Sequence, residues 1–437
     1  MVFSQEQLNN LDGKSLIQIF NELANMVVVN VEKQGISIPI YASFYVLMGQ
    51  YFKDIKIGFG SKEKDLRLNF FWVQNSRTGK GEHSGVAKQV ATGLGIRWTK
   101  VTKITDAGLL GSIDQFAIEY NYKNKLSEDD DRWKNPVVVG DLGNFDLIFF
   151  DECKQLLEPQ VYNENSMQIM QEALDYPGHV RSKLRFNVPI EYDCSCSIYA
   201  TTYYLGKSIE TSLLGTGFFQ RNMPYMKDVS IEENNSLRRR IIQKFNTSKK
   251  NQEVYNDMLN YFIHRVKSIN NSPRIIYLDN SAISELDNVF SLFNEEIKKS
   301  SGEALKILMS FSQTVIDICT KIGGINSIIE ERAFINASNI SSSYIMAKSM
   351  SDTIINKLSL TEQKTDNSYN AKRVKNILIL SGGKLSTSSL VDEVRDKLEV
   401  GRRKAHALIK KLINENYLRE ELGDGNTKFI LPAEDLR

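Results

Sequence analysis

A buried-strand pattern, a short polar loop and a helical pattern follow one another between residues 70 and 94. Residues 70–74 read Phe-Phe-Trp-Val-Gln, an apolar run of strand length, and apolar spacing typical of a helix covers 85–94. This order places backbone N–H groups and the ammonium of a lysine at a helix start, where they suit the phosphates of a nucleoside triphosphate. We expect the phosphates to be held by Ser76, Arg77, Thr78, Gly79, Lys80, Gly81 and Glu82.

Two residues depart from the usual phosphate-loop pattern. Gln74 stands where the first loop glycine is expected, and Gly81 stands where Ser or Thr would bind Mg²⁺. Thr78 or Ser84 would then have to supply the missing hydroxyl, or water would take its place. Otherwise hydrolysis would be impaired.

A second strand pattern ends in two adjacent carboxylates. Residues 147–150 read Leu-Ile-Phe-Phe, and Asp151 and Glu152 follow directly. Side chains at the carboxyl end of a strand can reach the ligand crevice of a parallel sheet. There Asp151 would orient Mg²⁺ through water, and Glu152 would polarise the water that attacks the γ-phosphate. The alternative is a buried strand that ends in Asp-Glu by chance.

The composition is that of a globular protein without a dominant charge. The chain has 437 residues, 41% of them hydrophobic, and a net charge of +2, so any nucleic-acid surface must be local. Four cysteines without metal-ligand spacing and four histidines argue against zinc and favour reduced thiols. No apolar run approaches the ~20 residues that span a bilayer, and the N-terminus lacks the order of a secretory signal. We therefore expect a cytoplasmic protein with no membrane partner.

Changes in residue pattern divide the chain into parts. Residues 1–55 look helical, and from 56 to 230 short β-rich runs alternate with helical patterns, as in an α/β sheet. Residues 231–365 have apolar positions at helical spacing and few prolines or glycines, which predicts a helical domain. A polar stretch at 361–370 predicts a linker.

The last part, residues 371–437, reads as a winged helix-turn-helix. Helical patterns cover 373–380, 387–398 and 399–416, and a turn signal joins strand patterns at 417–421 and 428–431. The third helix begins with the basic residues Arg402, Arg403 and Lys404, where they would meet a major groove or phosphates. Winged helices also bind proteins, and that alternative stays open.

Three basic residues alternate at Arg181, Lys183 and Arg185. On a strand they would share one face, which suits a nucleic-acid backbone. The alternative is a solvated edge strand whose charges prevent pairing with other chains.

Two further features follow along the chain. Thr201 and Thr202 end a strand pattern, where a hydroxyl could bind the attacking water or the γ-phosphate, although threonine is common in strands for propensity alone. Arg221 follows an apolar segment that contains glycine. An arginine donated to a neighbour's nucleotide stabilises transition-state charge, and a plain surface arginine is the alternative.

In this order the features resemble those of AAA+ helicase-type ATPases, most nearly the MCM-like and superfamily-3-like replicative helicases of viruses, phages and plasmids. The resemblance runs from about residue 70 to 437, and only its ATPase motifs are specific. It implies that Lys80 is the Walker A lysine, that Asp151 and Glu152 are the Walker B pair, and that Thr202 (or Thr201) is sensor 1.

The resemblance also implies roles for arginines outside these motifs. Arg221 would be the arginine finger, which acts on the nucleotide of the adjoining subunit. Arg181, Lys183 and Arg185 lie where such helicases carry a pore hairpin that grips DNA. Arg332 would open a lid helix and resembles a sensor 2 arginine.

The fold implied is an AAA+ P-loop ATPase core of the α/β class, followed by a helical lid and a winged helix. ATP and Mg²⁺ would be its cofactors. Its activity would be that of an ATP-dependent DNA helicase or translocase, in which the subunits form a ring, most simply a hexamer. Single-stranded DNA would pass through the pore, and duplex DNA could meet the winged helix.

Three other readings compete with the helicase. An origin-recognition or initiator ATPase uses the same fold to bind DNA without unwinding it. A degenerate ATPase could serve as a scaffold or loader subunit, which the glycine at position 81 favours. A DnaB-like motor fits less well, because its catalytic glutamate is expected nearer the phosphate loop.

Overall fold

The structure is a computed structural model. It describes residues 11–27, 37–74, 79–102, 104–153, 165–183, 189–203, 217–227, 229, 233, 235, 249–299, 302–365, 367–398, 400–414, 417–423 and 427–432. The chain forms two compact units, Met1–Ile355 and Asn356–Arg437. The boundary falls inside helix α15 (Ala337–Thr365).

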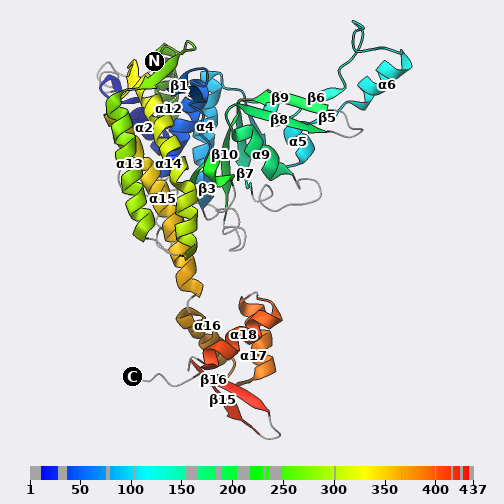
Figure 1. The fold of residues 1–437 in the computed structure, drawn as a ribbon, viewed down its shortest axis with the longest axis vertical. Helices are drawn as coiled ribbons and strands as arrows, with labels where there is room; N and C mark the ends of the chain where they lie inside the picture. Colours follow the sequence, from blue (N-terminus) through cyan, green and yellow to red (C-terminus); the bar gives the residue numbers. More distant parts are fainter. Residues whose placement is uncertain are drawn as a thin grey trace. The chain divides into compact units, whose positions relative to one another are not determined.

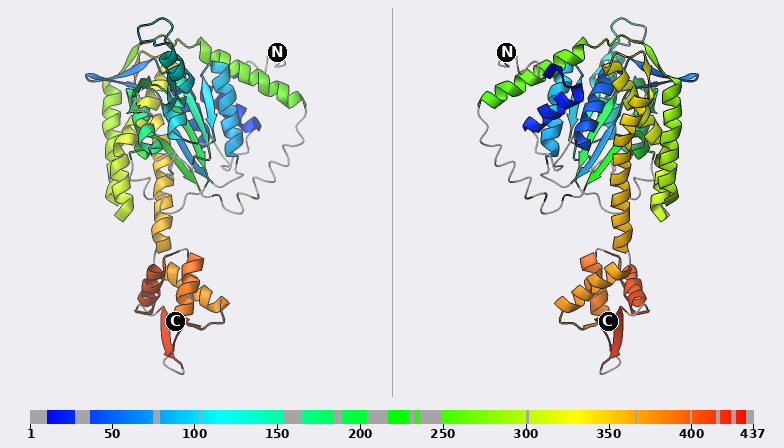
Figure 2. Two further views of the ribbon diagram at one scale, coloured as in Figure 1. Left: turned by 90° about the vertical axis from the view of Figure 1, so that its right-hand side faces the viewer. Right: turned by 90° about the vertical axis from the view of Figure 1, so that its left-hand side faces the viewer.

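The first unit is built on a five-stranded parallel sheet (Figure 1). In spatial order its strands are β11 (Met223–Lys227), β3 (Phe70–Gln74), β10 (Ser197–Thr202), β7 (Leu147–Asp151) and β4 (Trp98–Val101). Nearly every residue of β3, β7 and β10 is buried, because helices cover both faces of the sheet, as Figures 1 and 2 show. The predicted α/β sheet is therefore confirmed.

Helices from both ends of the unit cover one face of this sheet. They are α2 (Leu16–Val27), α3 (Ile38–Tyr51), α4 (Lys80–Leu94) and α12 (Lys249–Ser268). The rings of Phe20, Phe44 and Phe262 join α2, α3 and α12 in one cluster. The hydroxyls of Ser43 on α3 and Tyr199 on β10 lie 3.0 Å apart, so α3 packs directly on the sheet.

The chain order of the strands creates a point where the connections diverge. From β3 the chain passes through α4 to β4 at one edge, whereas from β10 it returns past β3 to β11. Right-handed connections that run in opposite directions place their crossing segments on opposite faces of the sheet. In open parallel sheets ligands bind in a crevice at such a point, so we expect the ligand crevice of this sheet between the carboxyl ends of β3 and β10.

Two insertions interrupt the passage from β4 to β10. Between β4 and β7 come α5 (Asp106–Leu110), β5 (Gly111–Ile113), α6 (Gln115–Lys123), β6 (Val137–Val139) and α7 (Asp141–Asn144). Between β7 and β10 come α9 (Ser166–Leu174) and the antiparallel hairpin of β8 (Gly178–Lys183) and β9 (Pro189–Cys194). The short helix η2 (Phe219–Arg221) then leads into β11.

A second sheet lies at the amino ends of the parallel strands, because residues 66–69 lead from it straight into β3. Its order is β13 (Phe334–Ile335), β12 (Ile275–Leu278), β1 (Lys56–Phe59) and β2 (Lys62–Asp65). The helices α13 (Asn280–Lys299), α14 (Gly302–Ile329) and α15 complete the unit. Thus the segment expected to be a helical lid also contributes two strands, and β12 pairs with β1 from the other end of the unit.

Among its described residues, the second unit, Asn356–Arg437, has the end of α15, three further helices and a three-stranded antiparallel sheet. The helices are α16 (Asn367–Leu380), α17 (Thr387–Leu398) and α18 (Arg402–Asn414), and the sheet has the order β14 (Leu385–Ser386), β16 (Lys428–Pro432), β15 (Leu418–Leu422). Val374, Leu390 and Ile409 are among the residues of its core. The predicted linker at 361–370 is instead helical in the described backbone, as the end of α15 and the start of α16.

Candidate functional site

Lys80 lies at the carboxyl end of β3, beside the crevice. Gly79 precedes it with a φ of 90°, a left-handed conformation that glycine adopts without strain, and α4 begins at Lys80. The Lys80 ammonium donates a hydrogen bond to the backbone oxygen of Gln74. The first N–H groups of an α-helix have no acceptor within the helix, so the start of α4 offers donors to an anion. Ser76, Arg77 and Thr78 lie outside the described residues.

The charge on Lys80 responds to its surroundings. Burial lowers the pKa of Lys80 to about 8, while the negative charges of Glu152 and of a Cys153 thiolate act in the opposite direction. Lys80 and Glu152 are 72 positions apart in the sequence (152 − 80) and were predicted to share one site. The effect of Glu152 on the pKa of Lys80 shows that they are close enough to interact. A buried ammonium gains stability from any phosphoryl charge placed beside it.

Glu152 follows the last residue of β7 with a φ of 61°. This conformation is uncommon for a residue other than glycine, and Lys125 and Glu331 are the other two described residues that adopt it. Strained backbone tends to cluster at functional sites. The Glu152 side chain is exposed. Its carboxylate is therefore free of the sheet and available to water above the crevice.

Asp151 has partners that the sequence analysis missed. Its carboxylate lies 2.6 Å from the Lys100 ammonium on β4 and 3.9 Å from that of Lys88 on α4. Burial, together with the nearby Lys100, lowers the pKa of Lys88, and Asp151 opposes that shift. The ammonium groups of Lys100 and Lys88 thus neutralise the Asp151 carboxylate, which was predicted to orient Mg²⁺.

The other expected Mg²⁺ contacts are absent from the described residues. Gly81 has no side chain to offer, Glu82 is exposed on the first turn of α4, and the buried Ser84 hydroxyl donates to the backbone oxygen of Gly81 at 2.9 Å. No group of three or more His, Cys, Asp or Glu side chains within the described part of the chain could hold a metal ion. These residues do not fit a metal held by the protein itself, so the Mg²⁺ site stays a prediction.

Thr202 brings an unpaired hydroxyl to the same end of the sheet. It lies on β10 beside Val73 of β3, and it is fully buried. Its Oγ1 has no hydrogen-bond partner among the described residues, although a buried hydroxyl is normally paired. Thr201 differs, because its hydroxyl reaches the Phe150 backbone oxygen at 3.5 Å. Of the two threonines, Thr202 is the one whose hydroxyl is left for a ligand or water.

Arg221 lies at the opposite end of the sheet. It lies two positions before Met223, the first residue of β11, which pairs with Phe70, the first residue of β3. The five residues of β3 separate it from the crevice by roughly 15 Å. Its guanidinium makes two hydrogen bonds to the Asp175 carboxylate, at 2.6 and 2.8 Å. Arg221 therefore cannot contact a nucleotide bound at Lys80 of its own protomer.

The structure does not bring Arg332 to the crevice either. Arg332 was expected to open a helix, but it lies in the turn between α14 and β13 and pairs with Glu330 at 2.9 Å. Because β13 belongs to the second sheet, Arg332 lies beside an edge strand of that sheet and not beside the five-stranded one. The expectation that it opens a lid helix is wrong, since α15 begins only at Ala337.

The predicted basic hairpin is partly described. Residues 178–183 form β8, as expected, but Arg185 lies outside the described residues, as does the side chain of Lys183. Arg181 is exposed and lies 3.5 Å from Glu191 on β9. His179 bonds Asp193 and Glu191 at 3.0 and 3.1 Å, and these bonds raise the pKa of His179, that to Asp193 most. Carboxylates on β9 thus offset part of the positive charge on β8.

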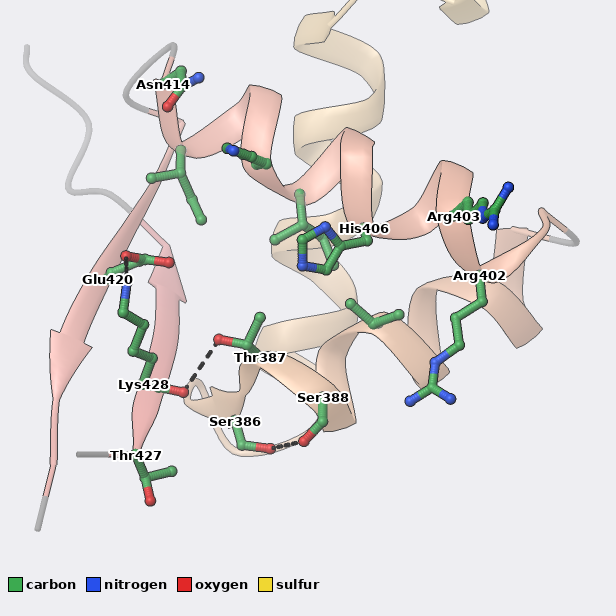
Figure 3. A pocket seen from close by; sticks show the side chains of 14 residues that line it. Ser386, Thr387, Ser388, Arg402, Arg403, His406, Asn414, Glu420, Thr427 and Lys428 are labelled. Atoms are coloured by element: carbon green, nitrogen blue, oxygen red, sulfur yellow. Dashed lines mark hydrogen bonds and ion pairs between the residues drawn. The ribbon is translucent and has the colours of Figure 1, made fainter. Parts of the chain in front are cut away.

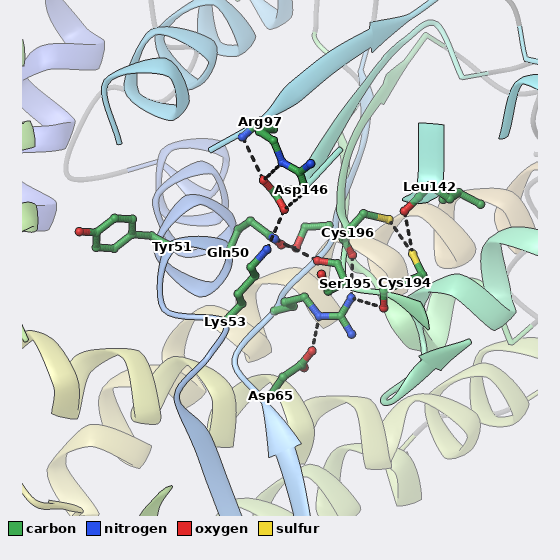
Figure 4. A network of polar contacts seen from close by, with 12 residues as sticks. Gln50, Tyr51, Lys53, Asp65, Arg97, Leu142, Asp146, Cys194, Ser195 and Cys196 are labelled. Atoms are coloured by element: carbon green, nitrogen blue, oxygen red, sulfur yellow. Dashed lines mark hydrogen bonds and ion pairs between the residues drawn. The ribbon is translucent and has the colours of Figure 1, made fainter. Parts of the chain in front are cut away.

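A buried arginine fixes the base of this hairpin. Arg67 donates to the Asp65 carboxylate and to the backbone oxygens of Asp175, Cys194 and Cys196, the last three at 3.2, 3.4 and 3.0 Å. Burial opposes ionisation of Asp65, yet Lys321 and Arg67 lower its pKa below the usual value. Figure 4 shows Asp65, Cys194 and Cys196 converging in this network.

Cys194 and Cys196 lie close together where the chain passes from β9 to β10. The chain leaves β9 at Cys194 and enters β10 at Ser197, so the two thiols lie on a bend with their sulfur atoms 3.4 Å apart. A hydrogen bond from the Cys196 thiol lowers the pKa of Cys194 below its usual value. Every cysteine of the chain is buried and free.

A basic groove of about 870 Å³ opens in the second unit between α17, α18 and the β15–β16 hairpin (Figure 3). Arg402, Arg403, His406 and Lys410 of α18 line it with Lys428 of β16. Hydroxyls at the start of α17 complete the wall, namely those of Ser386, Thr387 and Ser388. Its one acidic lining residue among those described is Glu420, which pairs with Lys428 at 3.0 Å.

The groove only partly matches the predicted basic helix. Arg402 and Arg403 line it, but the exposed Lys404 does not. His406 and Lys410 lie four and eight positions after Arg402 (406 − 402 and 410 − 402), so they share its helix face. The same spacing rule, applied to the sequence, could have identified both of them.

In the part of the chain that the structure describes, no helix is long and apolar enough to cross a membrane. No family model and no curated protein matches the chain, so its own residues and their geometry are the basis for a function.

Proposed function

We propose that the chain is an ATP-dependent motor that acts on nucleic acid, an AAA+ helicase-type ATPase with its ATP sites between subunits. One observation carries the proposal. Lys80, Glu152 and the unpaired hydroxyl of Thr202 each lie at the carboxyl end of one of three adjacent parallel strands, β3, β7 and β10, and Lys80 and Glu152 are close enough to interact. A cation, a carboxylate open to water and a buried hydroxyl are groups that phosphoryl transfer uses.

Each group has a distinct part in the proposed chemistry. The start of α4 and Lys80 bind the phosphates, whose charge restores the proton that burial tends to remove from the lysine. Glu152 accepts a proton from the attacking water. Thr202 orients that water or the γ-phosphate through its hydroxyl, which otherwise lacks a partner among the described residues.

The position of Arg221 supports a site shared between protomers. It lies at the amino ends of the strands, so its guanidinium can reach a nucleotide only in a neighbouring copy. A contact between the carboxyl-end face of one protomer and the amino-end face of the next is heterologous, and such contacts form a ring when the rotation between protomers closes. A hexameric ring remains our expectation.

Two surfaces suit nucleic acid. The cations of the second-unit groove can neutralise backbone phosphates, and its helix α18 and hairpin β15–β16 have the order of a winged helix. The β8–β9 hairpin carries fewer uncompensated charges, because Glu191 pairs with Arg181 and His179. We therefore assign the initial binding of DNA to the groove and its movement to the hairpin.

A Glu152→Gln variant tests the proposal. It should bind ATP as the wild type does, release no phosphate and separate no strands of a forked duplex, because an amide cannot accept the proton. Glu119→Gln, the same change at an exposed residue of α6, is the control and should behave as wild type. Phosphate release by Glu152→Gln at the wild-type rate would remove Glu152 from the mechanism.

A second candidate is a nucleotide-binding scaffold or loader without hydrolysis. The ion pairs of Asp151 with Lys100 and Lys88, together with Gly81, favour it. ATP binding without phosphate release by the wild-type chain would support this candidate. An initiator would hydrolyse ATP yet leave a forked duplex intact.

A further inference from the structure

A cavity of about 350 Å³ lies at the amino ends of β3 and β11, away from the crevice. Five cationic side chains and three carboxylates line it, Arg67, Arg221 and Lys321 among the cations. Asn222 lines it too, is 2% exposed, and its Oδ1 has no hydrogen-bond partner among the described residues. Asp65, which does not line the cavity, pairs with both Arg67 and Lys321, so the cations exceed the nearby carboxylates by one. One surplus cation beside an unpaired buried acceptor suits an anionic ligand that also carries a hydroxyl or bound water.

Arg221 lines this cavity with its guanidinium bound to Asp175. The Asp175 carboxylate binds the guanidinium through two bonds of 2.6 and 2.8 Å, and the Gly217 backbone oxygen accepts a third at 2.6 Å. The side chains of Arg221 and Asp175 are 27% and 51% exposed. Ion pairs between side chains this exposed are weak. A phosphoryl group can accept the same two hydrogen bonds from the planar guanidinium and carries more negative charge than the Asp175 carboxylate.

Asp175 also marks the base of the hairpin. It directly follows α9, and β8 begins three residues later at Gly178. Gly178 is packed so closely that a Cβ there would come within 2.4 Å of the Cys194 backbone oxygen. Any movement of Asp175 is therefore passed to the place where β8 meets β9.

The two arginines at this junction differ in how firmly they bind it. Arg67 is 6% exposed and pairs with Asp65, which is 2% exposed, so breaking that contact would leave buried charges unpaired. Arg221 is partly exposed and its pair can exchange with little loss. Arg67 is thus a fixed support of the hairpin base, and Arg221 an exchangeable one.

We infer that Asp175 is an exchangeable clamp on Arg221: a phosphoryl group that enters the cavity takes the guanidinium from Asp175 and loosens the junction between α9 and the β8–β9 hairpin. The inference rests on the proposed function, in which the phosphoryl group belongs to the neighbouring protomer's nucleotide. Asp175 is then a positioning residue, which links the nucleotide state of one subunit to the hairpin of the next.

Hydrogen exchange of residues 173–183 and 189–194 tests this clamp. Without nucleotide, Asp175→Asn should exchange about two- to fivefold faster than wild type, which is the effect of losing one exposed ion pair. A non-hydrolysable ATP analogue should accelerate the assembled wild type by a similar factor and leave Asp175→Asn unchanged. Asp317→Asn removes another carboxylate of the same cavity, one that pairs with Lys64, and should keep the wild-type response.

Inorganic tripolyphosphate, added to the chain at a dilution where it is monomeric, separates the sources of the phosphoryl group. If exchange is faster only in the assembled chain with the ATP analogue, the phosphoryl group comes from the neighbouring protomer's nucleotide. If exchange is also faster in the monomer with tripolyphosphate, free phosphates can supply the phosphoryl group as well. Arg221→Gln removes the other partner and should exchange fast without any ligand, which guards against a misfolded Asp175 variant.

The clamp is refuted if Asp175→Asn responds like the wild type, or if neither probe changes the wild type. A wild-type chain that hydrolyses no ATP contradicts the proposed function instead, and the tripolyphosphate experiment still decides the clamp.

Discussion

Lys80 should take up a proton when a nucleotide binds. Burial lowers its pKa to about 8, so about half of these side chains are neutral at pH 8 before binding. Phosphate charges favour the ammonium and raise this pKa. Binding should therefore consume about half a proton per site at pH 8 and about a tenth of a proton at pH 7. Because the bound state holds more protons, affinity should fall as the pH rises above 8, by up to about tenfold per unit.

Titration calorimetry measures this uptake. The binding enthalpy of a non-hydrolysable ATP analogue at pH 8 should differ between HEPES and Tris in proportion to the protons taken from the buffer. Lys80→Arg keeps the positive charge but cannot lose its proton, so its binding enthalpy should not depend on the buffer. Equal wild-type enthalpies in both buffers, or an undiminished buffer dependence in Lys80→Arg, would refute the reasoning.

Three more predictions follow from other residues. Thr202→Val should keep or raise the melting temperature, because it removes an unpaired buried hydroxyl. The same variant should release phosphate about tenfold more slowly or worse. A lower melting temperature would show that the hydroxyl is paired. Lys100→Met should free Asp151 and reduce the Mg²⁺ concentration needed for half-maximal hydrolysis, and an unchanged requirement would count against Asp151 as the metal's contact. Arg403→Ala should weaken DNA binding and reduce its salt slope by about one, whereas Lys384→Ala, outside the groove, should change neither.

Elements set by local chemistry were predictable from the sequence. The helical pattern at 387–398 has the same bounds as α17, where the Ser386 hydroxyl accepts a hydrogen bond from the Ser389 N–H. A helix cap and the apolar spacing of a helix depend on residues that are close together in the chain, so both can be recognised from the sequence alone.

Contacts between distant residues were not predictable. Asp151 was identified as a strand-end carboxylate, but its pairing with Lys100 depends on β4 lying beside β7 in the sheet. The pair of Arg221 with Asp175 likewise depends on the path of the chain between α9 and β11. A charged residue has many possible partners, and only the tertiary fold selects one.

The segment from 231 to 365 shows where a pattern misled. Its helical spacing is real, but Ile275-Ile276-Tyr277-Leu278 is a short run rich in β-branched and aromatic residues that follows Pro273, and it forms β12. The resemblance to AAA+ helicases implied that Arg332 opens a helix, whereas the chain turns there to form β13. The strand patterns of β12 and β13 cover only a few residues, so the helical spacing of the long segments on either side dominates the prediction.

A mixing experiment tests the central claim, a nucleotide site shared between two protomers, most directly. Glu152→Gln and Arg221→Ala chains should each release almost no phosphate alone. Mixed in equal amounts before assembly, they should recover about a quarter of the wild-type rate, because about one interface in four pairs an intact Glu152 with an intact Arg221. A mixture no more active than its separate components would contradict the account.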